Sequence, residues 1–209
     1  MSPGGHELSS EFIAQHQRER IFRGLAEAVT ERGYAETTVA DIVKHARVAR
    51  NTFYANFSSK QDCFLATFEF ASGQLMSELR QAGDRAEGGV SDRVRAGVDA
   101  FLAYVESEPA FAHLILIDAL SAGPEAMSGF EESVGAAARL LRPARELAGT
   151  TTPLPDATEE TIIGGVVWIV SQRLGSKPKR LTGLAPELVE FMLTPYLGPV
   201  QAREDAYSD

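Results

Sequence analysis

The chain of 209 residues contains 44% hydrophobic and 23% charged residues, which is typical of a globular protein and excludes a disordered or collagen-like chain. Its only cysteine, Cys63, excludes an intrachain disulfide and a cysteine-rich metal centre. The longest uncharged apolar run, residues 162–170, is too short to cross a bilayer, and the N-terminus lacks the pattern of a secretion signal. We therefore expect a cytoplasmic protein with no membrane association, no metal and no cofactor.

The formal net charge of −9 is unevenly distributed along the chain. Residues 1–60 contain 8 Lys and Arg against 7 Asp and Glu, whereas residues 61–209 contain 12 against 22. Residues 42–61 contain Lys44, Arg47, Arg50 and Lys60 and no acidic residue. A short basic stretch in an acidic chain is what a small phosphate-facing module requires, although a solvated basic patch would explain the same pattern.

The N-terminal part of the chain predicts a long helix after a flexible arm. Residues 1–9 show no periodicity, and we expect them to be flexible, as we expect of residues 201–209. The helix begins after Ser10, a suitable N-cap, and apolar residues recur at helical spacing as far as Arg32. Gly33 should end it, because glycine takes the left-handed conformation without a Cβ clash.

Three further helices are expected within the next fifty residues. Thr38 should cap a short helix, with Asp41 as its partner in a capping box. The next helix covers residues 49–56, and Ser59 should cap a longer one. The two short helices and the turn between them match the spacing of a helix-turn-helix, whose second helix enters the major groove of DNA.

The rest of the chain predicts only helices. Their expected ranges are 91–107, 109–121, 124–148, 157–175 and 186–197, with a loop at residues 150–155. Residues 162–170 are β-branched enough for a buried strand, but we predict helix because the pattern extends past strand length. The fold class is therefore all-α, with a three-helix helix-turn-helix domain at residues 10–60 and a larger helical ligand-binding and dimerisation domain at residues 61–200.

The run TTVADIVKHARVARNTFYANFSSKQDCF at residues 37–64, preceded by RERIFRGLAEAVTERGY, resembles the DNA-binding domain of TetR-family repressors. The segment Thr52–Lys60 is its most specific part. The resemblance implies that Tyr54 and Lys60 bind the phosphate backbone of double-stranded DNA. It also implies a homodimer and a cavity for a small-molecule effector.

The chemistry of the side chains suggests how the contacts to DNA divide. Phosphate contacts from Thr38, Tyr54 and Lys60 would position the protein, whereas base contacts would read the sequence. Reading should fall to the start of the third helix, because Arg suits guanine and Asn suits adenine. The expected DNA-binding residues are Thr38, Arg50, Asn51, Thr52, Tyr54, Asn56 and Lys60.

Two positions depart from the pattern of the family. Arg47 stands where the turn usually has glycine, and a side chain in the left-handed conformation costs about 1–2 kcal/mol. Ala49 stands where a Ser or Thr usually caps the third helix, which removes about 1 kcal/mol of stabilisation.

The apolar run at residues 162–170 suggests the dimer interface, because a helix that is apolar on all sides must be buried on all sides. One side of this helix would pack on its own domain. The other side, together with the last helix of the chain, would pack on a second subunit. The alternative is that the helix lies at the centre of its own domain's core. The expected interface residues are Ile163, Val166, Val167, Val170, Leu188, Met192 and Tyr196.

Aromatic and aliphatic residues in the middle of the chain suggest the effector cavity, although core packing is the more common role for each of them. The expected lining is Phe101, Tyr104, Phe111, His113, Leu114, Ile117, Asp118, Met127, Phe130 and Trp168. Residues 98–138 contain no Lys or Arg. We therefore expect a largely apolar or aromatic ligand, neutral or cationic, with Asp118 as the partner of a cation.

The function predicted from the sequence is a repressor that a small ligand releases from a palindromic operator. The chain shows no Gly-rich phosphate loop, His-Glu-x-x-His zinc site or Gly-x-Ser-x-Gly elbow, so we expect no enzymatic activity. The alternative is a helical protein that binds a small molecule or a partner without working DNA recognition.

Overall fold

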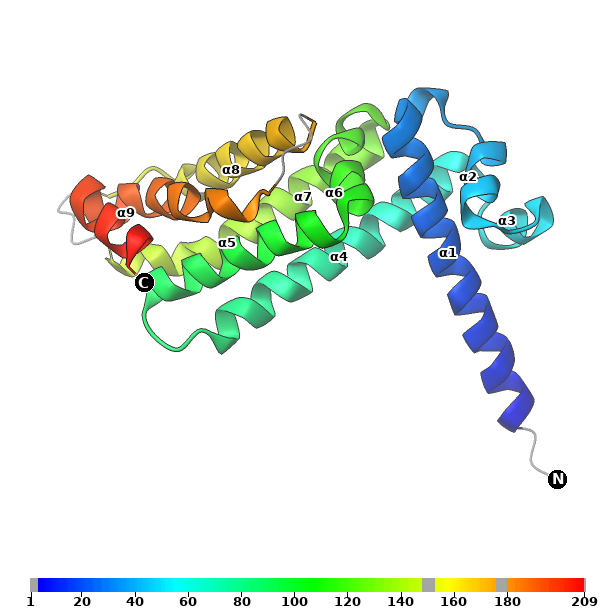
Figure 1. Ribbon diagram of the computed structural model, residues 1–209, viewed down its shortest axis with the longest axis horizontal. Coiled ribbons are helices and arrows are strands. Elements are labelled where there is room, and N and C mark those ends of the chain that lie inside the picture. Colours follow the sequence, from blue (N-terminus) through cyan, green and yellow to red (C-terminus); the bar gives the residue numbers. More distant parts are fainter. Residues whose placement is uncertain (1–3, 148–152, 176–179, 209) are drawn as a thin grey trace.

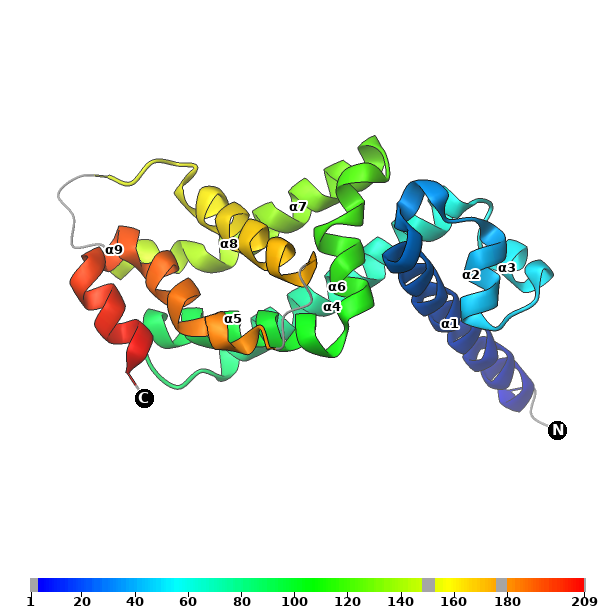
Figure 2. The ribbon, with the colours of Figure 1, turned by 45° about the horizontal axis from the view of Figure 1, so that its top comes forward.

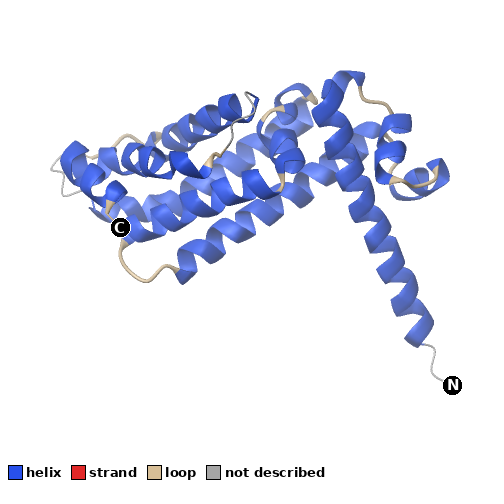
Figure 3. Cartoon of the chain, viewed as in Figure 1, coloured by secondary structure: helices blue, strands red, loops and turns tan. Residues whose placement is uncertain are grey.

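The computed structural model describes residues 4–147, 153–175 and 180–208. Every regular element in these ranges is a helix, which confirms the all-α prediction (Figure 3). A small N-terminal domain and the C-terminus lie at opposite ends of an elongated molecule (Figures 1 and 2).

The N-terminal domain is built from three helices and the start of a fourth. It contains α1 (Gly4–Glu36), α2 (Val39–Ala46) and α3 (Arg50–Asn56), and α4 (Lys60–Arg85) leads out of it. Its core is aromatic: Phe22 lies 5.8 Å from Phe57 between ring centroids, and Phe53 lies 5.8 Å from the same ring. This core packs α3 and the residue that follows it against α1.

The C-terminal domain is a bundle of helices that α4 joins to the first domain. In Figure 1, α4 lies along one edge of the bundle, with α8 and α9 along the opposite edge. The elements after α4 are α5 (Val90–Ser107), α6 (Pro109–Leu116), η1 (Asp118–Ser121), α7 (Pro124–Leu141), η2 (Arg142–Leu147), α8 (Thr158–Gly175), η3 (Thr182–Leu184) and α9 (Ala185–Tyr207).

The helices agree with the sequence predictions in number and order, with differences at the boundaries. Gly33 has φ 77°, as expected for the end of the straight part of α1. The apolar run at residues 162–170 is helical, within α8. The predicted loop at residues 150–155 and the end of the helix predicted at 124–148 lie partly outside the described residues.

Both termini differ from the expectation of flexible arms. Residues 4–9 continue α1, which projects beyond the N-terminal domain in Figure 1. At the other end, α9 bends at Gly198, with φ 76°, and continues to Tyr207. Ala202 and Ala206 are fully buried, and Arg95 of α5 donates a hydrogen bond to the carbonyl oxygen of Ala206 at 3.0 Å. Contacts with α5 therefore keep the part of α9 after Gly198 packed against the bundle.

Candidate functional site

The start of α2 is fixed by the predicted capping box. The Asp41 amide donates to Thr38 Oγ1 at 3.3 Å, and Asp41 Oδ2 accepts from the Thr38 amide at 2.9 Å. Hydrogen bonds from Thr38 lower the pKa of the Asp41 carboxyl group below its ordinary value. The Thr38 hydroxyl is already bonded to that carboxylate, at 2.6 Å, so a phosphate would meet the free backbone N–H groups at this helix end rather than the hydroxyl.

The turn between α2 and α3 forms despite the two unusual residues. Arg47 has φ 53° and ψ 45° and is the only non-glycine residue with positive φ in the described ranges. Arg20 of α1 donates a hydrogen bond at 2.9 Å to the carbonyl oxygen of Ala46 at the end of α2, which a helix end otherwise leaves unpaired. Ala49 supplies no side-chain cap to α3. The turn therefore has the left-handed geometry that glycine usually provides.

Helix α3 presents a polar face to solvent. Arg50, Asn51 and Tyr54 are exposed, and Arg50 Nη2 lies 3.4 Å from the Tyr54 hydroxyl. Thr52 is half-buried, and the Asn56 side-chain amide donates to its carbonyl oxygen at 2.8 Å. The exposed polar side chains of this face are therefore Arg50, Asn51 and Tyr54, whereas Asn56 is half-buried and bonded within its own helix.

Lys60 ties the beginning of α4 to the end of α1. Its ammonium group donates to the carbonyl oxygens of Tyr34 and Ala35 at 2.7 and 3.4 Å and lies 4.2 Å from the centre of the Tyr34 ring. Ser59 caps α4, as expected, by accepting from the Asp62 amide at 3.0 Å. An ammonium group has three donors, so Lys60 keeps one that could meet a phosphate.

The C-terminal domain encloses a cavity of about 600 Å³, which is within the range of small-molecule sites. Helices α4, α5, α6, α7, α8 and α9 all contribute to its lining. Most of the lining is apolar, including Leu75, Met76, Leu79, Val94, Val98, Ile115, Leu116 and Val134. Only Phe101 and Phe130 of the expected ligand-binding residues are among them.

The other expected ligand-binding residues lie elsewhere. Tyr104 and Leu114 are buried in the core, and the Tyr104 hydroxyl donates to the carbonyl oxygen of Ala71 at 3.1 Å. Trp168 is 63% exposed, on the outer side of α8. The aromatic residues of the sequence therefore do not identify the cavity lining, because a buried core contains the same residue types.

A second group of these residues lies where α6 and η1 pack against α1. His113 Nδ1 lies 2.6 Å from Asp118 Oδ2, and Asp118 is buried. Ile117 and Met127 are half-buried. Because His113 already pairs with it, Asp118 is not a free partner for a cationic ligand.

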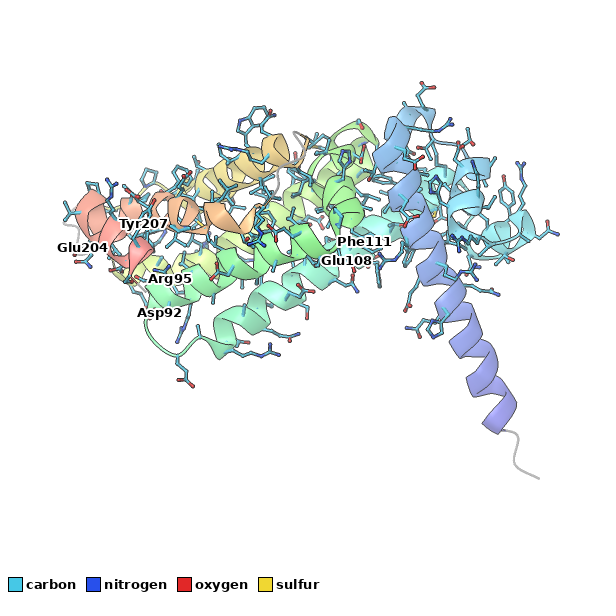
Figure 4. All side chains as sticks on the ribbon, in the orientation of Figure 1. Asp92, Arg95, Glu108, Phe111, Glu204 and Tyr207 are labelled. Atoms are coloured by element: carbon cyan, nitrogen blue, oxygen red, sulfur yellow. The ribbon has the colours of Figure 1, made fainter. Side chains whose placement is uncertain are left out.

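Phe111 belongs to the contact between the two domains. Its ring lies 5.9 Å from that of Phe70 in α4 and 5.3 Å from the Arg23 guanidinium of α1. Arg23 also donates to both Glu108 carboxylate oxygens, at 3.0 and 3.4 Å. Figure 4 shows Glu108 and Phe111 together on the side of the bundle that meets α1.

The residues expected at a dimer interface point into the protomer. Ile163, Val166, Val167 and Met192 line the cavity, and Val170, Leu188 and Tyr196 are buried. The outward side of α8 and α9 carries other apolar residues: Trp168, Ile169 and Phe191 are 63%, 43% and 48% exposed. The residues expected at the interface therefore lie on the inward sides of α8 and α9, because a run that is apolar throughout does not show which face points outward.

An ion pair between a buried carboxylate and a partly exposed arginine stabilises the far side of the bundle. Arg145 donates to the two carboxylate oxygens of Glu159 at 2.7 and 2.8 Å. The Tyr196 hydroxyl donates to the same carboxylate at 2.9 Å. The hydrogen bonds from Arg145 hold the pKa of Glu159 below its ordinary value, and burial raises the pKa of Tyr196. This network joins η2, α8 and α9.

Neither a metal site nor a membrane helix is found in the described part of the chain. No three His, Cys, Asp or Glu side chains there are grouped to hold an ion. No helix among the same residues is long and apolar enough to cross a bilayer.

These observations define a two-domain, all-helical protein with a helix-turn-helix at its N-terminal end and an apolar cavity in its C-terminal domain. Residues 21–67 match the sequence model described as bacterial regulatory proteins, tetR family. The N-terminal domain is thus similar to the DNA-binding domain of the TetR family, to which its motif had pointed.

Two sequence relatives are named as regulators. The HTH-type transcriptional activator FasR of Mycolicibacterium smegmatis is 29% identical over 50% of this chain and 48% of its own length. The fatty acid metabolism regulator protein of Bacillus subtilis is 31% identical over 30% of this chain and 32% of its own length. The matched part thus spans half or less of each relative.

The whole fold is that of solved structures of such regulators. The fatty acid degradation regulator FadR from Bacillus halodurans superposes with a TM-score of 0.73 at 19% identity, over 84% of this chain and 97% of that one. FadR from Bacillus subtilis, solved in complex with stearoyl-CoA, gives the same TM-score and coverage at 16% identity.

Proposed function

We propose that this chain is a dimeric transcription regulator that releases its DNA operator when an amphiphile with a long apolar chain occupies the cavity. The observation that carries the proposal is the position of α6. Ile115 and Leu116 of this helix line the cavity, and Phe111, one turn earlier, contacts Arg23 of the DNA-binding domain. A ligand that moves α6 therefore acts on α1.

The DNA-binding part of the proposal rests on the exposed face of α3. Arg50 and Asn51 would read bases, and Tyr54, the free donor of Lys60 and the N–H groups after Thr38 would bind phosphates. Thr52 and Asn56 would support this face from within the helix. The left-handed turn at Arg47 favours this function over a protein without working DNA recognition, because it preserves the motif's geometry.

Dimerisation is proposed for the outward side of α8 and α9. Trp168, Ile169 and Phe191 expose large apolar side chains there, and exposed apolar patches mark interaction surfaces. Gly165 allows α8 to approach Phe191 of α9 closely, because a Cβ atom at Gly165 would lie 3.2 Å from that ring. A symmetric pair of such surfaces would place two α3 helices on one duplex.

The ligand class is proposed from the cavity and the relatives together. Aliphatic side chains from six helices surround the interior, which suits an alkyl chain. Three similar proteins support an acyl ligand for this chain: the fatty acid metabolism regulator of Bacillus subtilis, the fatty acid degradation regulator of Bacillus halodurans, and the FadR structure that holds stearoyl-CoA. Such a ligand shifts the DNA equilibrium only by binding the DNA-free conformation more tightly.

The test begins with fragments of genomic DNA that the purified full chain selects. A dimer should select a pseudo-palindrome with half-sites about 10–10.5 bp apart or a multiple of that spacing. Arg50→Ala should weaken cognate binding by about 1–3 kcal/mol and relax preference at one base position. Lys60→Ala should weaken binding to cognate and random DNA alike and flatten the salt dependence.

Stearoyl-CoA is then added to the preformed complex. Release of the DNA supports the proposal. Tighter DNA binding would contradict the release mechanism and would indicate a ligand-dependent activator. The absence of any salt-dependent DNA binding would overturn the regulatory function itself and favour the alternative of a helical protein that binds a small molecule or a partner.

A further inference from the structure

The exposed residues of the cavity lining all lie at one end. They come from the end of α4, the start of α5, the end of α7 and the start of η2, and they are Arg80, Asp84, Arg93, Arg139, Leu140 and Pro143. All other lining residues are buried or half-buried. The cavity therefore opens to solvent at the end of the bundle that lies away from the DNA-binding domain (Figure 1).

This opening, which we call the distal mouth, carries three arginines and a single carboxylate. Arg80, Arg93 and Arg139 come from three different helices. Within the described ranges, none of their guanidinium groups makes a hydrogen bond or an ion pair with another residue. Arg23, Arg95 and Arg145 are all bonded. Three free guanidinium groups thus converge on one opening of a domain that is otherwise strongly acidic.

Helix electrostatics do not account for these positions. A cation stabilises the last turn of a helix, which applies to Arg139 in α7. Arg93, however, lies in the first turn of α5, where a positive charge opposes the helix dipole. Arg80 lies more than a turn before the end of α4. Two of the three arginines therefore gain nothing from the ends of their helices.

We infer that the distal mouth binds the anionic head group, a carboxylate or a phosphate, of the amphiphile whose chain fills the cavity. Guanidinium groups bind both anions through paired, charge-assisted hydrogen bonds. The inference rests on the proposed function for the apolar chain and adds the charge and direction of the ligand. The chain end would point towards Ile115 and Leu116, next to the DNA-binding domain, and the head would remain at the surface.

This inference departs from the expectation of a neutral or cationic ligand. That expectation relied on the absence of Lys and Arg from residues 98–138. The three arginines lie outside this window and meet only when α4, α5 and α7 assemble.

The experiment compares ligands with one chain and different heads. Dodecanol, dodecanoate, dodecyl phosphate and dodecanoyl-CoA are titrated into the full-length protein by calorimetry at low and high salt. The affinity of the anionic probes should be at least about ten-fold higher than that of dodecanol, as expected for charge-assisted hydrogen bonds. This advantage should decrease at high salt, because the arginines are exposed. Tight binding of dodecanoate indicates a fatty-acid head, whereas preference for the two phosphate-bearing probes indicates a phosphorylated one.

The triple variant Arg80→Gln, Arg93→Gln, Arg139→Gln should lose the preference for anions and keep its affinity for dodecanol. Arg85→Gln is the matched control, because Arg85 is an exposed arginine near the same end of α4 that does not line the cavity. Thermal unfolding checks that the triple variant is folded, and single variants replace it if it is not. Equal affinity for dodecanol and the anions would overturn the head-group inference alone. Failure of every probe to bind would overturn the apolar-chain ligand as well.

Discussion

Gly24 of α1 lies so close to Ala46 of α2 that a Cβ atom on Gly24 would stand 2.7 Å from the Ala46 Cβ atom and 2.8 Å from its Cα atom. The neighbouring atoms belong to the backbone or to its first side-chain carbon, so they cannot rotate away. The crossing of these helices sets the position of the turn and of α3. Gly24 is therefore required by the packing of the DNA-binding domain rather than by any backbone angle.

Gly24→Ala should destabilise the protein by about 1–3 kcal/mol, the usual cost of overpacking, and should weaken DNA binding. Gly73→Ala is the matched control. It makes the same substitution within α4, where a Cβ atom would meet nothing within 4 Å, so it should gain about 0.5–1 kcal/mol from helix propensity. Urea unfolding measures both changes. Equal effects of the two variants would show that α1 and α2 do not pack at this distance.

Substitution of Arg47, in the turn after α2, should also change the stability of the protein. Its left-handed conformation favours glycine, so Arg47→Gly should stabilise the protein, by up to about 1 kcal/mol after the greater freedom of glycine in the unfolded chain is subtracted. Arg47→Ala removes the same side chain and keeps the strain, and should show no such gain in thermal unfolding. A gain in both variants would assign the effect to the side chain's charge instead.

The helix-turn-helix was predictable because its signals are local. Thr38 and Asp41 form their capping box within four residues, and Gly33 ends a helix by its own backbone freedom. The departures at Arg47 and Ala49 were also visible in the sequence. What the sequence did not contain was the compensating contact, because Arg20 reaches the end of α2 from a different helix.

The cavity was predicted less well because its lining comes from distant segments. Leu75, Met76 and Leu79 form an apolar stripe on α4 that has the same sequence pattern whether it faces a packed core or a cavity. The arginines of the distal mouth share no local pattern. On α8, Val167 and Trp168 are adjacent in the sequence, yet one lines the cavity and the other faces solvent. A helix that is apolar on every side does not show its orientation.

The ion pair between Arg145 and Glu159 should make stability depend on pH in the acid range. The pKa of Glu159 is lower in the folded chain than in the unfolded one, so the pair stabilises the fold above the unfolded value of about 4.3. This stabilisation is lost as the pH falls through the lower, folded value. Glu159→Gln should therefore lower the free energy of unfolding at pH 7 by roughly 1–3 kcal/mol.

Urea unfolding between neutral and acid pH tests this prediction. The difference between Glu159→Gln and the parent chain should shrink as the carboxyl group of the parent becomes protonated. Glu160→Gln is the matched control, because Glu160 is the exposed neighbour on the same helix, and it should leave the profile unchanged. A difference that stays constant down to the lowest pH would show that the charge of Glu159 is not what stabilises this network.

Trp168→Glu should convert the proposed dimer into a folded monomer. Trp168 is 63% exposed in the protomer, so the substitution costs little within one chain, but a dimer would bury the new charge without a partner. Leu120→Glu introduces the same charge at an apolar side chain that is 50% exposed on η1, and should leave the dimer intact. Light scattering gives the mass of each variant, and a dimer of Trp168→Glu would place the interface elsewhere.

The contact of Arg23 with Glu108 should transmit ligand binding to the DNA-binding domain. It joins α1 to the residue before α6, and its side chains are 55% and 32% exposed, so it adds less than about 1 kcal/mol to stability. Glu108→Gln should therefore leave the fold, the ligand affinity and the DNA affinity of the free protein nearly unchanged. What should change is the factor by which ligand weakens DNA binding, typically about 5–150-fold in allosteric proteins, which should fall several-fold. Because such coupling is reciprocal, DNA should weaken ligand binding by the same reduced factor.

Arg32→Gln is the control, because Arg32 is an exposed arginine of α1 that faces Asp41 within the N-terminal domain. Titrations of ligand with and without DNA measure the factor, and an unchanged factor in Glu108→Gln would show that α6 acts on α1 through Phe111 and its other contacts rather than through this ion pair.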